Sequence, residues 1–214
     1  MAGYFPLFVD IQGQNVAVFG GGVQALEKIR RLLPFSPRIT VISPLFDPKI
    51  EQLAKEGSIQ VICCGDVTKF EEILHTLRPY LVLVGDLEDA FCEHLHAVCV
   101  ECGIPINVED KTRFCTFMFP SLVKQGPLTV AISTSGASPA AAKKLREELE
   151  EQLPTRVEEI LDWLGALRPT VRANTRINPQ KRAALWRELV DRSFLLDRPL
   201  TAEEVGKICI SYEN

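Results

Sequence analysis

The 214-residue chain is long enough to bury a sizeable core, either as one domain with an appendage or as two small domains. Hydrophobic residues make up 46% of the chain and charged residues 24%, which is ordinary globular usage and excludes a disordered polymer. The 24 Lys and Arg against 28 Asp and Glu give a net charge of −4, so we expect no nucleic-acid partner. The opening residues show no basic stretch followed by a long apolar run, and no segment is apolar over a membrane-spanning length. We therefore expect a cytoplasmic protein without a membrane partner, whose seven cysteines are free thiols.

Short apolar runs alternate with runs of helical spacing in the first half of the chain. After an extended segment at 5–11, the apolar runs predict strands at 16–19, 38–42, 59–63, 80–84 and 104–108. Between them, amphipathic runs predict helices at 23–33, 48–56, 69–77 and 89–102. Strands that are apolar throughout and alternate with helices are typical of a parallel sheet covered on both faces. The predicted fold class is therefore α/β, with a Rossmann-like doubly wound parallel sheet.

The pattern changes after residue 113. Two further apolar runs predict strands at 114–123 and 128–133, but no strand–helix unit follows them. From Pro139 the pattern is mostly helical, with helices predicted at 139–152, 154–167, 179–192 and 201–207. We therefore expect three parts, which are a dinucleotide-binding domain at 1–113, a small α+β segment at 114–153 and a helical C-terminal domain at 154–214.

A glycine-rich turn joins the first predicted strand to the first predicted helix. The turn has the pattern Gly-x-Gly-x-x-Ala and consists of Gly20, Gly21, Gly22, Val23, Gln24 and Ala25. Glycines let the backbone approach a pyrophosphate closely, and the N–H groups at the helix N-terminus then bind it. In this strand–turn–helix context the pattern predicts a dinucleotide site, with a glycine-rich turn that binds nothing as the alternative.

The second predicted strand ends in Ser43 and Pro44, at the expected position of the cofactor ribose. A carboxylate there would accept a hydrogen bond from the ribose 2′-hydroxyl and would disfavour a 2′-phosphate. The first acidic residue is Asp47, which comes later, and a serine hydroxyl can bond either group. The sequence therefore does not distinguish NAD from NADP.

Two polar segments are candidates for chemistry. Asn107-Val108-Glu109-Asp110 ends a predicted parallel strand, at the edge where open α/β sheets bind ligands, so Asp110 is a candidate general base. A surface aspartate in a turn is the alternative. The second segment contains Ser133, Thr134, Ser135, Gly136 and Ser138, whose hydroxyls either line a pocket or only cap the following helix.

Cysteine and histidine do not predict a metal site. Cys99-x-x-Cys102 has the spacing of metal ligands and His96 lies nearby, but no second pair completes a four-ligand set. Free cysteines in a helix beside apolar residues more often pack as small hydrophobes. We therefore expect core packing and no bound metal.

With the segments in order, the chain resembles the precorrin-2 dehydrogenase family, which also forms the N-terminal module of sirohaem synthases. The matching runs are Tyr4-Phe5-Pro6-Leu7-Phe8, Gly20-Gly21-Gly22-x-x-Ala25-x-x-Lys28, Ile39-Thr40-Val41-Ile42-Ser43-Pro44, Asn107-Val108-x-Asp110, Phe117-x-x-Pro120-Ser121, Gly126-Pro127-Leu128-x-Val130-Ala131-Ile132-Ser133-Thr134 and Gly136-x-Ser138-Pro139.

The resemblance implies an oxidoreductase that uses NAD to convert precorrin-2 to sirohydrochlorin in sirohaem biosynthesis. It places the family's essential aspartate on Asp110, as general base, and the family's substrate loop on residues 133–138. It also implies an intertwined homodimer, in which the middle segment serves dimerisation and the helical tail closes over the tetrapyrrole. Asp86 stands where many members carry threonine, near the expected nicotinamide, so we assign it to the cofactor site.

The segment from 168 to 198 contains eight basic residues and only three acidic ones, and the sequence does not decide what binds to this excess of positive charge. The acetate and propionate groups of precorrin-2 would suit arginine forks, while a solvated helix face is the alternative. The basic residues are Arg168, Arg172, Arg176, Lys181, Arg182, Arg187, Arg192 and Arg198.

Two other functions remain open. One is a chelatase that inserts Fe²⁺ or Co²⁺ into sirohydrochlorin, with or without dehydrogenase activity, since Asp110 could also take protons from the pyrroles. The other is a non-catalytic NAD-sensing module, which the glycine turn fits equally well. The substrate loop and the helical tail argue against a sensor, because a sensor has no need of them.

Overall fold

The computed structural model describes residues 3–213, and contacts between their backbones divide them into two units. One unit comprises the residues up to 120 together with 133–138, and the other comprises 121–132 and the residues from 139 onward. The three-part division expected from the sequence stays a prediction.

Five parallel strands form the sheet of the first unit, in the order β3-β2-β1-β4-β5. The strands are β1 (Asn15–Phe19), β2 (Arg38–Ser43), β3 (Gln60–Cys63), β4 (Leu81–Val84) and β5 (Ile106–Val108). The chain runs outward from β1 to β3 and then crosses back to β4, so the strand order reverses between β1 and β4. Open α/β sheets bind ligands at the carboxyl edge of such a reversal. The predicted Rossmann-like sheet is confirmed.

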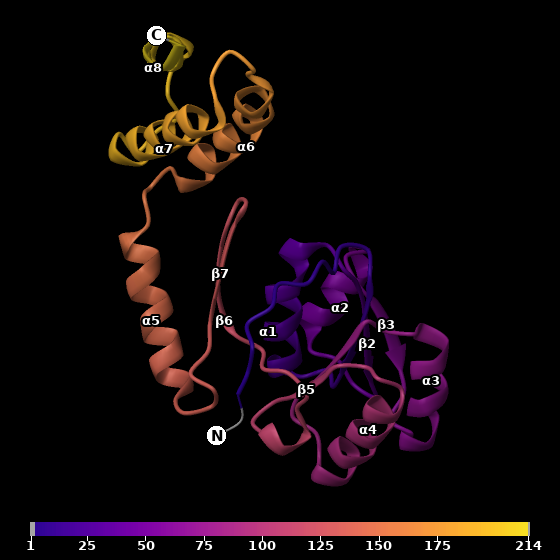
Figure 1. Ribbon diagram of the computed structural model, residues 1–214. Helices are drawn as coiled ribbons and strands as arrows, with labels where there is room; N and C mark the ends of the chain where they lie inside the picture. The colour runs from indigo at the N-terminus through magenta and orange to yellow at the C-terminus, as the bar shows by residue number, and fades with distance from the viewer. Residues whose placement is uncertain (1–2, 214) are drawn as a thin grey trace. The chain divides into compact units, whose positions relative to one another are not determined.

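Helices cover both faces of this sheet, with α1 and α2 on one side and α3 and α4 on the other (Figure 1). Residues alternate along β1, so Val16 and Val18 pack toward α1 and α2, whereas Ala17 and Phe19 pack toward α3 and α4. All four side chains are at most 1% exposed, as expected for a central strand. The helices are α1 (Val23–Leu32), α2 (Pro48–Lys55), α3 (Phe70–Leu77) and α4 (Asp89–Glu101), and 3₁₀ turns occupy Leu33–Phe35, Val67–Lys69 and Thr112–Phe114.

The second unit contains an antiparallel hairpin and four helices. The hairpin pairs β6 (Ser121–Gln125) with β7 (Leu128–Ile132) across Gly126-Pro127, and Gly126 has the positive φ (+51°) that a type II′ turn requires at its first central residue. Helices α6, α7 and α8 share a core that includes Val171, Leu189 and Ile208. The helices are α5 (Pro139–Gln152), α6 (Val157–Ala173), α7 (Pro179–Leu195) and α8 (Ala202–Glu213). None of the helices between residues 3 and 213 is long and apolar enough to cross a bilayer.

Residues 5–11 belong to no helix or strand, and the extended segment expected there stays a prediction. Three other local predictions need correction. Most of 114–123 is not a strand, because Thr116 N–H donates to the Ile106 carbonyl and ties this stretch to the end of β5, so β6 begins only at Ser121. The helix expected at 154–167 begins at Val157 and continues past Pro169 to Ala173, and the last helix ends at Glu213 instead of residue 207.

Candidate active site at the carboxyl edge of the sheet

The turn between β1 and α1 depends on glycine at two positions. Gly20 has φ +104°, a conformation that side chains with a Cβ rarely adopt, and its N–H donates to the Ile42 carbonyl (2.9 Å). A Cβ on Gly21 would overlap the Leu45 carbonyl oxygen and would lie 2.9 Å from Ser43 Oγ. The turn is therefore packed against the end of β2, which places Ser43 beside it.

The N-terminus of α1 is free to receive an anion. Gly22 is its N-cap, and no side chain caps the helix and no acidic residue stands in its first turn. A Cβ on Gly22 would meet no atom within 4 Å, so open space lies in front of this position. The first N–H groups of a helix have no partner inside the helix and carry its positive dipole end. These residues therefore fit the pyrophosphate of a dinucleotide.

The remaining predicted residues of the turn divide into exposed and buried positions. Val23 is 63% exposed and Gln24 is half-buried, whereas Ala25 is buried. The Ala25 Cβ would lie 3.6 Å from a Cβ on Gly85, so two small residues let α1 approach the end of β4. This close contact is the packing role of the third small residue in a dinucleotide turn.

The first acidic residue after β2 serves as a helix cap. The Asp47 carboxylate accepts from the Lys49 N–H (2.8 Å) at the start of α2. Ser43 is buried beside Gly21, and Pro44 is exposed. The cofactor ribose would therefore meet a serine in place of a carboxylate, and NAD and NADP are not distinguished here.

A buried lysine that sequence reasoning did not assign to the site connects the ends of β4 and β5. Lys28 of α1 is only 4% exposed, and its Nζ donates to Asn107 Oδ1 (2.8 Å) and to the Val84 carbonyl (3.2 Å). It also forms an ion pair with Glu109 (2.8 Å), which is 37% exposed. The signal was present in the sequence, because a lysine on the apolar face of a helix needs a polar partner when it is buried.

Asn107 extends this network to the segment after β5. Its Nδ2 donates to the Phe117 carbonyl (3.1 Å) while its Oδ1 accepts from Lys28, so both ends of the amide are used. Cys115 Sγ lies 3.2 Å from both the N–H and the carbonyl oxygen of Val108. Side chains on both sides therefore hold the strand end that carries Asp110.

Asp110 lies at the exposed turn that follows β5. Its φ of +55° is left-handed, a conformation that aspartate and asparagine tolerate better than most residues. Within residues 3–213 the Asp110 carboxylate has no hydrogen-bonding partner. A carboxylate held by its backbone and free at its oxygens can accept a proton from a bound ligand.

Lys111, the residue after Asp110, binds to the loop after β4. Its Nζ donates to the Leu87 carbonyl and pairs with Asp89 (2.9 Å). The hydrogen bond from Lys111 lowers the pKa of Asp89, and the same bond raises the pKa of Lys111. Asp86 lies in this same loop and is exposed. The network thus brings Asp86 and Asp110 to the same sheet edge as the glycine turn.

The predicted substrate loop is a tight turn in which two hydroxyls already have partners. Ser133 Oγ accepts from the Ser135 N–H (3.1 Å), and Thr134 Oγ1 accepts from the Ser138 N–H (3.2 Å). Ser135 (φ +54°) and Gly136 (φ +82°) are both left-handed and exposed. A Cβ on Gly136 would lie 3.9 Å from Thr112 Cγ2. The loop therefore contacts Thr112, which follows Asp110 by two positions in the sequence.

The cysteine and histidine residues of α4 do not form a cluster of metal ligands in the described part of the chain. Within the described residues, no group of three or more His, Cys, Asp or Glu side chains could hold a metal ion. Cys99 packs in the core, and burial raises the pKa of its thiol to about 12, whereas Cys102 is exposed at the end of α4. His96 Nδ1 lies 3.0 Å from the Phe114 carbonyl oxygen. Core packing is thus confirmed for Cys99 and is wrong for Cys102, whose position at the end of α4 leaves it in contact with solvent.

The chain is similar to known proteins over most of its length. The family model of NAD(P)-binding domains matches residues 7–121, and that of the central domain of sirohaem biosynthesis proteins matches residues 125–152. A "Siroheme synthase 1" of Aeromonas salmonicida is 32% identical over 95% of this chain, and a "Siroheme synthase" of Neisseria meningitidis serogroup C is 30% identical over 89%. The chain spans 40% and 38% of the length of these two relatives.

A solved structure titled "SirC, precorrin-2 dehydrogenase" has the same fold. It matches with a TM-score of 0.74 and 22% identity, over 98% of this chain and 99% of that one. The resemblance to sirohaem-synthase proteins is thus confirmed. The chain belongs to the family of NAD(P)-binding domains, which its residues 7–121 match.

Proposed function

We propose that this chain is an NAD-dependent precorrin-2 dehydrogenase that forms sirohydrochlorin. The observation that carries the proposal is one edge of the sheet, where the glycine turn and the N-terminus of α1 follow β1 and where Asp110 follows β5. Within residues 3–213 the Asp110 carboxylate has no hydrogen-bonding partner. The sirohaem-synthase relatives and the matched central-domain segment support precorrin-2 as the substrate.

The reaction removes a hydride and a proton from the tetrapyrrole. A bound nicotinamide supplies the hydride acceptor. Gly20, Gly21 and Gly22 bind the pyrophosphate, and Ser43 meets the ribose. One carbon–hydrogen bond of the substrate breaks and its hydrogen leaves as hydride, while the Asp110 carboxylate accepts the proton that leaves a second position of the tetrapyrrole. The carboxylate returns this proton to water after the product leaves. The loop at 133–138 contacts the substrate.

An anaerobic assay tests the proposal. Precorrin-2 and NAD are mixed with the protein, and the absorbances of sirohydrochlorin and NADH are followed together. Asp110→Asn retains the size of the side chain and tolerance of the left-handed φ, so it removes only the base. We expect the wild type to form both products at equal rates and the variant to be about 10²- to 10⁴-fold slower. Asp162→Asn, an exposed aspartate of α6, is the matched control and retains full activity.

The same Asp110 carboxylate favours a second activity, the insertion of Fe²⁺ or Co²⁺ into sirohydrochlorin. An exposed base without a partner can take protons from pyrrole nitrogens, and that step needs no nucleotide. Metal insertion without NAD, lost in Asp110→Asn, would establish the chelatase. If the protein binds NAD but catalyses neither dehydrogenation nor metal insertion, the result would favour a nucleotide-sensing module.

We further propose that the chain acts as a homodimer, in line with its family resemblance. The N-terminal segment exposes large apolar side chains, and the most exposed are Phe5, Leu7 and Phe8 at 86%, 73% and 68%. Such an apolar patch is a common mark of a protein interface. Light scattering that gives the mass of a monomer at micromolar concentration would contradict the dimer.

A further inference from the structure

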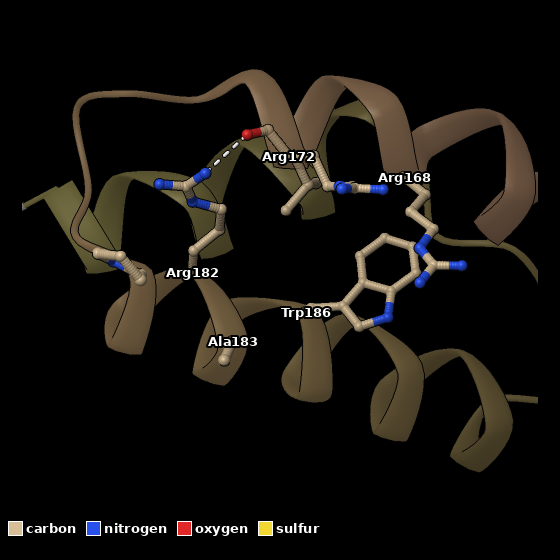
Figure 2. Close-up of a pocket in the computed structure, with 7 residues that line it drawn as sticks. Arg168, Arg172, Arg182, Ala183 and Trp186 are labelled. Atoms are coloured by element: carbon tan, nitrogen blue, oxygen red, sulfur yellow. Dashed lines mark hydrogen bonds between the residues drawn. The ribbon is translucent and has the colours of Figure 1, made fainter.

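A pocket of about 350 Å³ opens between α6 and α7 of the helical unit (Figure 2). Its apolar lining includes Val171, Pro179 and Trp186. Figure 2 shows the side chains of Arg168 and Arg172 extending from α6 toward the Trp186 indole. These two arginines are four residues apart, so they project from the same face of the helix. The pocket thus combines an apolar wall with a concentration of positive charge.

The positive charge of this pocket has no carboxylate partner in the described part of the chain. Within residues 3–213, no ion pair joins Arg168, Arg172 or Arg182 to a carboxylate. Other arginines of the same region do have such partners, namely Arg176 with Glu213, Arg192 with Glu188 and Arg198 with Glu204. Three arginines gathered around one pocket repel one another, so an anion bound there would relieve the repulsion.

The three arginines have different roles. Arg182 donates to the carbonyls of Arg172 (2.7 Å) and Ile177 (3.3 Å), so it braces the chain that leaves α6. Its Nε is buried without a partner. Arg168 and Arg172 are exposed, and neither guanidinium has a carboxylate partner among the described residues. Two guanidinium groups can each hold a carboxylate through paired hydrogen bonds.

We propose that Arg168 and Arg172 bind carboxylate arms of the anionic tetrapyrrole in this pocket, with the ring edge against Trp186. This inference rests on the proposed function, which supplies a substrate that carries acetate and propionate arms. The pocket volume is near the lower end of small-ligand sites, roughly 300–1,000 Å³, and therefore suits the arms better than the whole macrocycle. The half-buried indole offers an apolar face to the ring.

The direct test is a titration with uroporphyrin, an air-stable tetrapyrrole with acetate and propionate arms. The chain has two tryptophans, so Trp163→Phe leaves Trp186 as the only indole, and its fluorescence reports binding. In this background R168A/R172A is compared with R176A/R187A, which removes the same charge outside the pocket. We expect the pocket pair to raise the Kd at least about tenfold and the control pair to change it less than about twofold. Circular dichroism verifies that each variant is folded.

Two further measurements complete the test. R168K/R172K retains the charge but loses the planar fork, so its Kd lies between those of the wild type and the alanine pair, and it replaces that pair if alanine prevents folding. Inorganic phosphate at the concentration of uroporphyrin should not displace the porphyrin. Displacement would assign the pocket to phosphate groups and overturn the proposal, as would equal Kd values for the two alanine pairs or no binding by the wild type.

The dehydrogenase assay separates the two proposals. With precorrin-2 and NAD, R168A/R172A should raise the KM for precorrin-2 and retain both kcat and the KM for NAD. Uroporphyrin binding that depends on the pocket, without any NADH formed by the wild type, would overturn the proposed function and leave the tetrapyrrole site in place. Full turnover with an unchanged KM and Kd in R168A/R172A would overturn the site and leave the function.

Discussion

Lys28 and Asn107 are 79 residues apart in the sequence, yet Lys28 Nζ lies 2.8 Å from Asn107 Oδ1 and both side chains are buried. The contact joins α1, which begins at the glycine turn, to β5, which ends two residues before Asp110. The two halves of the candidate active site are therefore held together by one polar network beneath them. Glu109 is the ion-pair partner of this buried lysine, and the partial exposure of its carboxylate limits what the pair contributes to stability.

Removal of the Lys28 charge should destabilise the protein. Lys28→Met retains the apolar stem and volume but leaves the Asn107 amide oxygen buried without its donor, so we expect a loss of about 2 kcal/mol in the free energy of unfolding. The Glu109 contribution is small because that carboxylate is partly exposed. Urea denaturation measures the change. Lys49→Met, at an exposed position of α2, should stay within about 0.5 kcal/mol of the wild type, and an equally stable Lys28→Met would refute the network.

Neighbouring glycines of the turn should respond differently to alanine. A Cβ on Gly21 would overlap the Leu45 carbonyl, so Gly21→Ala should lose about 1–3 kcal/mol of stability. Gly22 has open space and a φ of −89°, so Gly22→Ala should fold normally and weaken NAD binding at least about tenfold, because its methyl stands where the pyrophosphate approaches. Calorimetry gives both quantities. Tight NAD binding by Gly22→Ala would contradict the assignment of the cofactor to this turn.

The helical unit should lose stability in acid through Glu204. Hydrogen bonds from Arg198 lower the pKa of Glu204 to about 2, from its ordinary value of 4.5. A carboxylate with a lowered pKa in the folded state stabilises above its unfolded pKa, and this contribution fades as the pH falls from 4.5 toward 2. Glu204→Gln should therefore show a weaker dependence of Tm on pH across this window. Glu203→Gln, whose partner Lys207 is exposed, should behave as the wild type.

Thiol labelling should distinguish core cysteines from surface cysteines. Burial raises the pKa of the Cys99 thiol to about 12, so Cys99 stays protonated and shielded at pH values near 8. Cys63 and Cys102 are exposed and should react with iodoacetamide in the native protein. Mass spectrometry of peptides before and after unfolding gives the reactivity of each site. Rapid native labelling of Cys99 would show that α4 does not pack as described.

The sequence by itself determined the α/β class and the position of the glycine turn. Apolar strands alternate with amphipathic helices, and Gly20, Gly21 and Gly22 stand between the first strand and the first helix. These are local signals, since periodicity and glycine content act within one element or one turn. For the same reason the expected strand at 114–123 was wrong, because Thr116 is tied to Ile106 by a hydrogen bond that no local pattern reveals.

Only the tertiary structure decided which polar residues meet. The Lys28 side chain bonds to Asn107, and Lys111 bonds to the loop after β4. Three of the eight basic residues line a pocket, and none of the three has a carboxylate partner within residues 3–213. Each of these contacts joins residues on different elements, or depends on which side of a helix faces a neighbour. Their distances follow from strand order and packing, which depend on the whole chain, whereas a helix or a turn depends on a few adjacent residues.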